Sequence, residues 1–449
     1  MILVVVLYVI LVAITAFGPL RWSIIAFLLL STIDFPGERS AVGLLNAGKG
    51  IVLPLYLLWR LRRYSGHRMV ILAPIAWAAL VLYAAIAAFW SIFPLSAFKL
   101  AGHMAGSLLI SFVFIRATKG GYLSQSVLLP VTVGTLALGL LCFAFEPAWT
   151  GEAGRFTSFM PAQGFASFLA ALFCLALCSQ ALRPQVRTAV CIAIVIALIF
   201  NGSRIWFFGI LISTVIALLV SDLRAWIKLC TLGAIVIVAS VLIRQSSSIV
   251  ERLGQDASSN RIVAAVSALY EGDSASWGLG TLNFRKTIGA TAVERIKESS
   301  ISELIFGHGT SNAAIITGSL YRGYSGYGDP NRMLHNEWLR ILYEWGLIGF
   351  LFWCLFVGSI AVFAFEGIRK DPDGNSKPLL AYLPPFLIGL AGENFLAGAG
   401  SAMSVGFLLL IGIASIAHRQ ARDRSFERMR ALSALRAESD LRAFSRTAV

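Results

Sequence analysis

The sequence predicts an all-α polytopic membrane protein with about 12 transmembrane helices and one large outward-facing loop. Of its 449 residues, 57% are hydrophobic and only 13% are charged, and the mean hydropathy is +0.78. Apolar segments of spanning length recur along the whole chain, which excludes a soluble domain with one anchor. The first residues, MILVVVLYVILVAITAF, lack a basic start and a small-residue cleavage site, so we interpret them as a retained first span.

The candidate spans follow from apolar runs that are long enough to cross a bilayer. They are about 2–33 (interrupted at Gly18-Pro19), 41–59, 69–90, 98–115, 122–145, 161–182, 186–201, 205–220, 225–243, 335–365, 378–397 and 401–417. The first run fits one kinked helix or two short helices. The chain then divides into an N-terminal membrane bundle (1–243), a large loop (244–334), C-terminal membrane helices (335–417) and a basic tail (418–449).

Basic residues orient the chain, because loops rich in lysine and arginine remain in the cytoplasm. They gather in alternate loops, at Arg60, Arg62, Arg63 and Arg68, Arg116 and Lys119, Arg183 and Arg187, Arg224 and Lys228, Arg369, Lys370 and Lys377, and in the tail. The C-terminus is then cytoplasmic. The tail alternates alanine, leucine and arginine at helical spacing, which favours an amphipathic helix on the anionic inner leaflet. The formal net charge of +14 also suggests nucleic-acid binding, but its spread over short loops disfavours that interpretation.

The large loop 244–334 faces outward and directly precedes the segment HNEWLRILYEWGLIGFLFW at 335–353. Within the loop, residues 283–306 carry apolar side chains at helical intervals, which predicts partly buried helices across the outer face of the membrane. His335 and Asn336 open the next helix, where free N–H groups and a partial positive charge favour an anionic substrate. Alternatively, His335 only begins this helix and Asn336 caps it.

The run LIFNGSRIWFFGIL places four polar or small residues, Asn201, Gly202, Ser203 and Arg204, between two apolar halves near the outer surface. This pattern predicts a broken helix or a tight turn. Arginine is well shaped for bidentate contact with phosphate oxygens, and backbone N–H groups would approach the same anion. The alternative is an arginine that extends from a span to the membrane surface.

Other outward-facing residues are weaker candidates. Arg155 lies in GRFTSFMPAQG just before a span, and extension of the side chain to the surface accounts for Lys49 and Lys99. The residues alone do not distinguish Arg285, which opens the stretch 283–306, from the other loop arginines, Arg261 and Arg322. His308, in the turn GHGTSN, is interpreted as structural.

Several function classes lack their motifs. The six cysteines lie in apolar runs without CxxC spacing, and GxxxxGK[ST], HExxH, outward DxD and GxSxG are absent. We therefore expect neither a metal nor a cofactor. Intramembrane carboxylates are scarce, with Glu393 the main exception. A histidine and several arginines on one face suit attack on a centre whose leaving group is phosphate or pyrophosphate.

At these residues the chain resembles the O-antigen ligase and O-antigen polymerase family of bacterial envelope enzymes. Three segments carry the resemblance: NGSRIWFFGIL, the sequence from NFRK through LIFGHGTSN, and LHNEWLRILYEWGLIGFLF. GRFTSFMPAQGFASFLA is a weaker fourth, with Ala162-Gln163 where the family usually has asparagine. The order of the segments around one large loop makes the set more specific than any one motif.

The resemblance implies a C-type glycosyltransferase fold in the bacterial inner membrane, a periplasmic active site and undecaprenyl pyrophosphate carrying a glycan as donor. It implies a metal-independent, inverting transfer, with His335 as the base and with Arg204 and Arg285 on the pyrophosphate. Among the other polar residues of this face, we expect five to contact substrate: Ser203, Arg155, Asn336, Lys99 and Arg322.

The acceptor is either the lipid A core, for a ligase, or a growing lipid-linked glycan, for a polymerase, and we favour the ligase slightly. A transporter of polyprenyl-linked glycans would use the same arginines only to bind the headgroup. The sequence disfavours it, because inverted repeats and paired broken helices are not evident.

Overall fold

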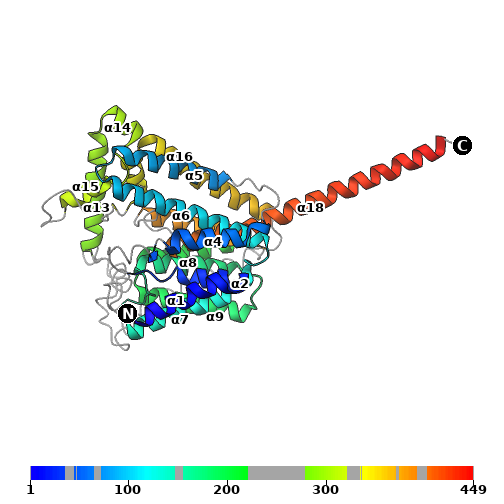
Figure 1. Ribbon diagram of the computed structural model, residues 1–449, viewed down its shortest axis with the longest axis horizontal. Coiled ribbons are helices and arrows are strands. Elements are labelled where there is room, and N and C mark those ends of the chain that lie inside the picture. The colour runs from blue at the N-terminus through cyan, green and yellow to red at the C-terminus, as the bar shows by residue number, and fades with distance from the viewer. Residues whose placement is uncertain are drawn as a thin grey trace.

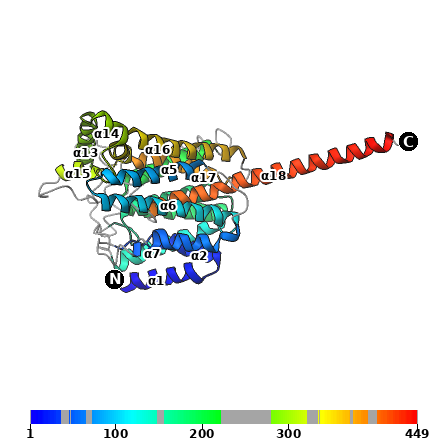
Figure 2. The same ribbon diagram turned by 45° about the horizontal axis from the view of Figure 1, so that its top comes forward.

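The computed structural model describes residues 2–35, 45–46, 48–64, 72–146, 155–220, 279–320, 334, 336–370, 374–391 and 402–447, and the regular elements among them are helical. The long helices lie side by side in one bundle (Figures 1 and 2). We name one end of the bundle the loop end, because it carries α13 (Leu279–Lys297), α14 (Ile301–Phe306) and α15 (Ala313–Leu320). The opposite end, from which α18 (Ala402–Thr447) projects, is the tail end.

Among the described residues, five helices are long and apolar enough to cross a membrane. They correspond to α5 (Leu72–Ala87, continued to Trp90), α6 (Pro94–Lys119), α7 (Leu128–Phe145), α9 (Pro184–Asn201) and α16 (Glu337–Lys370). The shorter apolar helices are α1 (Ile2–Phe17), α2 (Leu20–Leu30), α8 (Ala162–Cys178), α10 (Arg204–Leu219), α17 (Lys377–Leu390) and the first part of α18. An all-helical membrane protein is therefore confirmed. The predicted number of 12 spans stays a prediction, and the candidate span 225–243 lies outside the described residues.

The predicted break at Gly18-Pro19 separates α1 from α2, which pack against each other as two helices. Pro19 has no N–H to continue a helix, and a Cβ atom on Gly18 would lie 2.5 Å from the carbonyl oxygen of Ile14. Arg60, at the end of α4 (Leu53–Arg60), donates to the carbonyl oxygens of Ala16 at 3.1 Å and of Gly18 at 2.8 Å. Its guanidinium thereby satisfies carbonyl groups that the end of α1 leaves without helical partners.

The centre of the bundle is α8, which is buried on all sides from Phe165 to Ala176 and packs against α9, α10, α17 and α18. A helix that is apolar all round is expected in such a position. α10 and α17 also pack closely, with the rings of Trp206 and Tyr382 stacked at 5.8 Å between centroids. A Cβ atom on Gly389 would lie 2.9 Å from the Trp206 ring. Glycine therefore allows the two helices to approach here.

Three of the loops that the charge pattern assigns to one side of the membrane meet at the tail end. The side chain of Gln125 accepts a hydrogen bond from the Ser179 hydroxyl at 3.0 Å and donates to Oδ1 of Asn375 at 3.2 Å. Arg419 of α18 donates to the carbonyl oxygen of Lys119 at 2.9 Å. These three loops thus lie together at the end opposite the helices of the large loop, whereas their cytoplasmic location stays a prediction.

The predicted amphipathic stretch 283–306 forms most of α13 and all of α14, and one face of α13, at Ile288 and Ala292, is buried against α15 and α16. The chain restarts as α14 at Ser300, whose hydroxyl accepts a hydrogen bond from the N–H of Glu303 at 3.3 Å. The Glu303 carboxylate accepts one from the N–H of Ser300 at 2.8 Å, which completes a capping box. Helices therefore form over this stretch, whereas their position across the outer face of the membrane stays a prediction.

The basic tail is a direct continuation of the last apolar helix. Residues 404–417 of α18 are buried in the bundle, and the helix then runs on to Thr447. Figure 1 shows this part projecting away from the bundle. The helical tail is confirmed, whereas its contact with the inner leaflet stays a prediction.

The two ends of the bundle should face opposite sides of the membrane. Ser302 on α14 and Ser425 on α18 are both exposed, so a cysteine at either position should react readily. We expect Ser302→Cys to react with a membrane-impermeant maleimide in intact spheroplasts, and Ser425→Cys only after permeabilisation. The unsubstituted protein gives the background from the native cysteines. Labelling of Ser425→Cys in intact spheroplasts at the rate of Ser302→Cys would contradict this topology.

Candidate functional site

The predicted break before Arg204 is present at the loop end. α9 ends at Asn201, and Gly202 adopts the left-handed conformation, with φ 71°, that terminates many helices. Ser203 is extended, and α10 begins at Arg204. Because a side chain at φ 71° is strained, glycine at 202 is what allows the chain to turn here. The arginine therefore lies at a helix N-terminus, where unpaired N–H groups collect.

The segment 155–163 binds to this turn through backbone and side-chain hydrogen bonds. The N–H of Phe156 donates to the carbonyl oxygen of Phe200 at 3.0 Å, and Nε of Arg155 donates to the carbonyl oxygen of Asn201 at 2.6 Å. The Asn201 amide donates back to the carbonyl oxygen of Phe156 at 2.9 Å. These bonds hold Arg155 against the turn that precedes Arg204, and both arginines are half-buried. We call Arg155, this turn and Arg204 one cluster.

Ser203 belongs to the same cluster, but its hydroxyl is already engaged. It donates to Oε1 of Gln163 at 2.6 Å. Gln163 was not among the expected site residues, although it is the position at which the fourth motif departs from the family pattern. The glutamine side chain reaches Ser203 from the first turn of α8, so the residue at this position directly contacts a predicted site residue.

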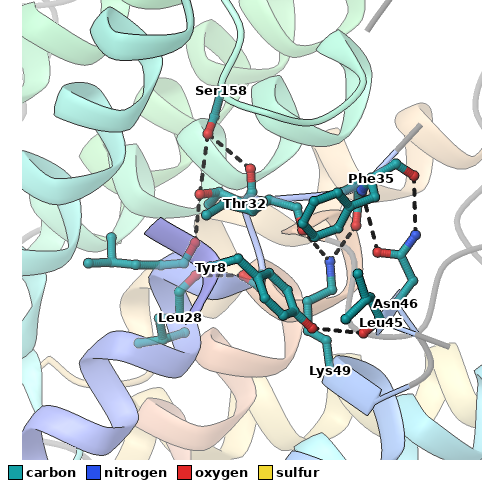
Figure 3. Close-up of polar contacts among 12 residues, drawn as sticks. Tyr8, Leu28, Thr32, Phe35, Leu45, Asn46, Lys49 and Ser158 are labelled. Atoms are coloured by element: carbon teal, nitrogen blue, oxygen red, sulfur yellow. Dashed lines mark hydrogen bonds and ion pairs between the residues drawn. The ribbon is translucent and has the colours of Figure 1, made fainter. Parts of the chain in front are cut away.

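A second polar network supports the segment 155–163 from the other side (Figure 3). The Ser158 hydroxyl donates to the carbonyl oxygen of Thr32 at 2.9 Å, and the N–H of Asp34 donates to the carbonyl oxygen of Phe159 at 2.6 Å. Lys49 pairs with the Asp34 carboxylate, and Lys49 is only 1% exposed.

The interpretation of Lys49 as a lysine extending to the membrane surface is therefore wrong. Its ammonium group also donates to the carbonyl oxygen of Ile33 at 2.8 Å (Figure 3). A buried ammonium is costly unless it is paired, and both partners are supplied by the segment that follows α2. Lys99, the other residue interpreted in this way, lies exposed in the second turn of α6.

Arg285 lies half-buried on α13, three residues before the buried Ile288. On the next turn, a Cβ atom on Gly289 would lie 3.7 Å from Cδ1 of Leu339 in α16. Leu334 is buried in the same small core as Ile288. Arg285 is therefore carried by the helix face that packs on the residues either side of His335. His335 and Arg322 themselves lie outside the described residues.

Asn336 caps α16. Its Oδ1 accepts a hydrogen bond from the N–H of Leu339 at 3.1 Å, and its carbonyl oxygen accepts one from the N–H of Arg340 at 3.0 Å. The capping interpretation of Asn336 is confirmed. Its role in substrate binding stays a prediction.

The first turns of α16 also contain a buried charge cluster that sequence reasoning missed. Arg340, 1% exposed, lies 3.4 Å from the carboxylates of both Glu337 and Glu344. Glu344 additionally accepts a hydrogen bond from the N–H of Ala313 at the start of α15, at 3.3 Å. The sequence feature that could have revealed this cluster is the spacing of the three charged residues, which puts them on one helix face. This cluster joins the helix after His335 to the large loop.

Two of the motifs behind the family resemblance, the turn in LIFGHGTSN and the helix that begins in LHNEWLRILYEWGLIGFLF, contact each other directly. α16 is broken at Gly346, with φ 59° and ψ −160°, so the predicted single span from 335 contains a short first part and a long second part. The break admits the turn 307–309, where the N–H of His308 donates to the carbonyl oxygen of Tyr343 and the N–H of Gly309 to that of Glu344, each at 2.9 Å.

The interpretation of His308 as structural fits its contacts. Its ring stacks on Tyr343 with centroids 4.2 Å apart, and Nε2 lies 2.8 Å from the Ser299 hydroxyl. Burial lowers the pKa of His308, while the facing Glu303 carboxylate opposes that shift. The side chain thus packs the turn against α16.

The structure therefore brings the predicted residues together in two groups. Arg155, Ser203 and Arg204 share the cluster on α8, α9 and α10, whereas Arg285 and Asn336 belong to the packing of α13 on α16. In the described part of the chain, no cluster of three or more histidine, cysteine or acidic residues has the arrangement of a metal site.

The close approach at Gly346 leads to a stability prediction. A Cβ atom there would lie 2.5 Å from the carbonyl oxygen of Ile305, in a backbone conformation that is essentially limited to glycine, so Gly346→Ala should cost at least about 1–3 kcal/mol. We expect a lower unfolding temperature and faster proteolysis within the loop. The control is Gly358→Ala in the same helix, where the added Cβ meets nothing within 4 Å. Equal unfolding temperatures and protease patterns for the two variants would show that the approach is not a constraint.

Comparison with known proteins agrees with the motifs. A family model described as O-antigen ligase matches residues 189–354. No curated protein matches the chain. The matched segment includes most of α9, all of α10, α13, α14 and α15, and α16 as far as Cys354. Arg204, Arg285 and His335 all fall within it, whereas Arg155 and Lys99 do not. The match to this family over residues 189–354 agrees with the resemblance that the motifs carry, and it covers all three of the segments on which that resemblance rests.

Proposed function

We propose that the protein is a glycosyltransferase that moves a glycan from undecaprenyl pyrophosphate to an acceptor saccharide, as an O-antigen ligase acting on the lipid A core. The observation that carries the proposal is the O-antigen ligase match, which contains Arg204, Arg285 and His335 in one segment. The arrangement of a titratable residue and several arginines at one end of a membrane bundle suits a reaction that expels a pyrophosphate.

The reaction requires a general base and cationic groups that stabilise the negative charge of the leaving group. The acceptor hydroxyl oxygen attacks the anomeric carbon from the face opposite the leaving group, and the bond from that carbon to the pyrophosphate oxygen breaks with inversion. His335 takes the proton of the hydroxyl. Arg204 and Arg285 stabilise the charge that develops on the departing undecaprenyl pyrophosphate, so the proposal requires no metal ion.

The remaining expected residues surround this reaction. Arg155, whose Nε bonds the carbonyl oxygen of Asn201, adds a second cation beside Arg204. Asn336, Lys99 and Arg322 complete the set that we assign to the substrate glycans, with Ser203 next to Arg204. The loop end faces the periplasm in this proposal, the C-terminus is cytoplasmic and the protein resides in the inner membrane.

The glycan profile of a deletion strain tests the proposed function. A ligase predicts loss of capped lipopolysaccharide while lipid-linked polymeric chains remain intact. Capped lipopolysaccharide with only single repeats would indicate a polymerase instead, and repeats trapped on the cytoplasmic side would indicate a transporter.

Conservative changes at the two arginines test the charge clamp. We expect Arg204→Lys and Arg285→Lys to lose much of their activity, because an ammonium group cannot reproduce a planar contact with two phosphate oxygens. Loss of one such contact costs on the order of 2–4 kcal/mol, or about 30- to 1,000-fold in rate. Transfer from purified lipid-linked donor measures the effect.

The matched control is Arg295→Lys, an exposed arginine on the same helix as Arg285 whose guanidinium pairs with Glu298 at 3.7 Å. This variant should transfer normally. If Arg204→Lys and Arg285→Lys also turned over at the normal rate, these arginines would serve only to hold helices.

Variants of His335 separate a base from a residue that only begins a helix. A general base contributes roughly 10²- to 10⁴-fold, so His335→Ala should bind donor lipid and lose most transfer. Because Asn336 is the cap of α16, His335→Asn should also lose transfer while keeping its unfolding temperature. Donor binding and transfer are measured on the same preparations. Normal transfer by His335→Asn would rule out the base.

A further inference from the structure

An apolar groove runs between α7 and α9, next to the cluster of Arg155 and Arg204. Its cavity measures about 420 Å³. Three residues of α7 from Leu136 to Phe143 and four of α9 from Ala193 to Phe200 line it, together with Phe156. The side chains of these lining residues are all apolar. α7 and α9 both pack against α8 and lie together on one side of the bundle (Figure 1).

The groove lies in the half of the bundle nearer the loop end and is open to the side. α7 ends at Phe145 and α9 at Asn201, so the lining residues occupy the last turns before the loop end. From Leu136 to Phe143 the α7 wall rises about 10 Å. Leu140 is 61% exposed and Ile196 is 48% exposed, which is the exposure expected where apolar chains of the membrane can enter.

Two arginines are next to lining residues of the groove at its loop end. Phe156 and Phe200, which line the groove, are joined by the hydrogen bond of 3.0 Å between their backbones. Arg155 directly precedes the first of them, and Arg204 follows the second after the turn at Gly202. The opposite wall ends at one acidic residue, Glu146. The loop end of the apolar groove therefore lies beside the turn that Arg155 binds and that Arg204 follows.

This pairing fits one kind of amphiphile, a long apolar chain with a strongly anionic headgroup. We propose that the groove holds the isoprene units next to the diphosphate of the polyprenyl donor, an inference that rests on the proposed function. With the diphosphate at Arg155 and Arg204, the chain descends past Phe156 between α7 and α9. A zwitterionic phospholipid would not match the two cations, and the remaining isoprene units extend into the bilayer.

Small residues make the room for this chain. Ala193 and Ala197 lie one turn apart on the α9 wall, so neither side chain fills the space between the helices. Gly139 of α7 accommodates the Phe156 ring, because a Cβ atom there would lie 2.7 Å from Cζ of Phe156.

Photo-crosslinking of the full chain tests the groove directly. The protein, reconstituted in phosphatidylcholine vesicles with undecaprenyl diphosphate that carries no glycan, receives p-benzoylphenylalanine at Leu140. The control position is Ile192, which is 54% exposed on α9 and does not line the groove. We expect the polyprenyl diphosphate adduct at Leu140 to exceed that at Ile192 several-fold by intact mass. Excess phosphatidylglycerol should not compete.

A blocked groove supplies the second measurement. Ala193→Trp should lower both the adduct at Leu140 and the rate of transfer several-fold, whereas Ile192→Trp should leave both unchanged. If Ala193→Trp fails to fold, the comparison of crosslinks at Leu140 and Ile192 in the otherwise unaltered chain still tests the proposed groove. Adducts of equal yield at Leu140 and Ile192, or adducts of phospholipid alone, would overturn the inference and leave an ordinary lipid contact.

The outcomes also separate this inference from the proposed function. Normal transfer by a folded Ala193→Trp, together with the loss expected for Arg204→Lys, refutes the groove and leaves the transfer reaction intact. A specific crosslink at Leu140 in a protein that transfers no glycan supports the groove and refutes the glycosyltransferase.

Discussion

The close approach of the turn 307–309 to the break in α16 fixes the geometry of the loop end. Both partners must be glycine where they meet, because a Cβ atom on Gly307 would lie 2.3 Å from the carbonyl oxygen of Glu344 and one on Gly346 would lie 2.5 Å from that of Ile305. Two backbone hydrogen bonds at 2.9 Å, both donated by the turn to carbonyl oxygens of α16, then tie α14 and α15 to α16. Loop and membrane helix consequently form one packed unit around the start of α16.

The buried charges beside this approach have a cost that the packing must offset. Arg340 between Glu337 and Glu344 removes three charged groups from water, and such sets add little net stability compared with apolar residues of similar size. Removing one member is nevertheless expensive, at about 3–5 kcal/mol, because the others stay buried. The charge cluster therefore contributes more to specificity than to stability. Glu344 accepts from both Arg340 and the N–H of Ala313, which favours one arrangement of α15 on α16.

Local patterns predicted the helices and several of the turns. Hydropathy located the apolar helices, and the glycines at 18 and 202 marked breaks that the backbone requires. Charge placement predicted which loops gather at the tail end. Arg155 and Arg204 were each suspected, but their shared cluster depends on hydrogen bonds between residues about 45 positions apart. The pairing of Lys49 with Asp34 and the groove between α7 and α9 depend likewise on packing, which no local pattern encodes.

The matched family segment is not a separable unit, because the preceding helices complete it. Asn201 and Ser203 lie within residues 189–354, yet their hydrogen-bond partners at Arg155, Phe156 and Gln163 lie outside. The segment 155–163 is in turn held by the end of α2 through Ser158 and Phe159. A change in the N-terminal helices can therefore displace the turn that carries Arg204 without altering a family motif.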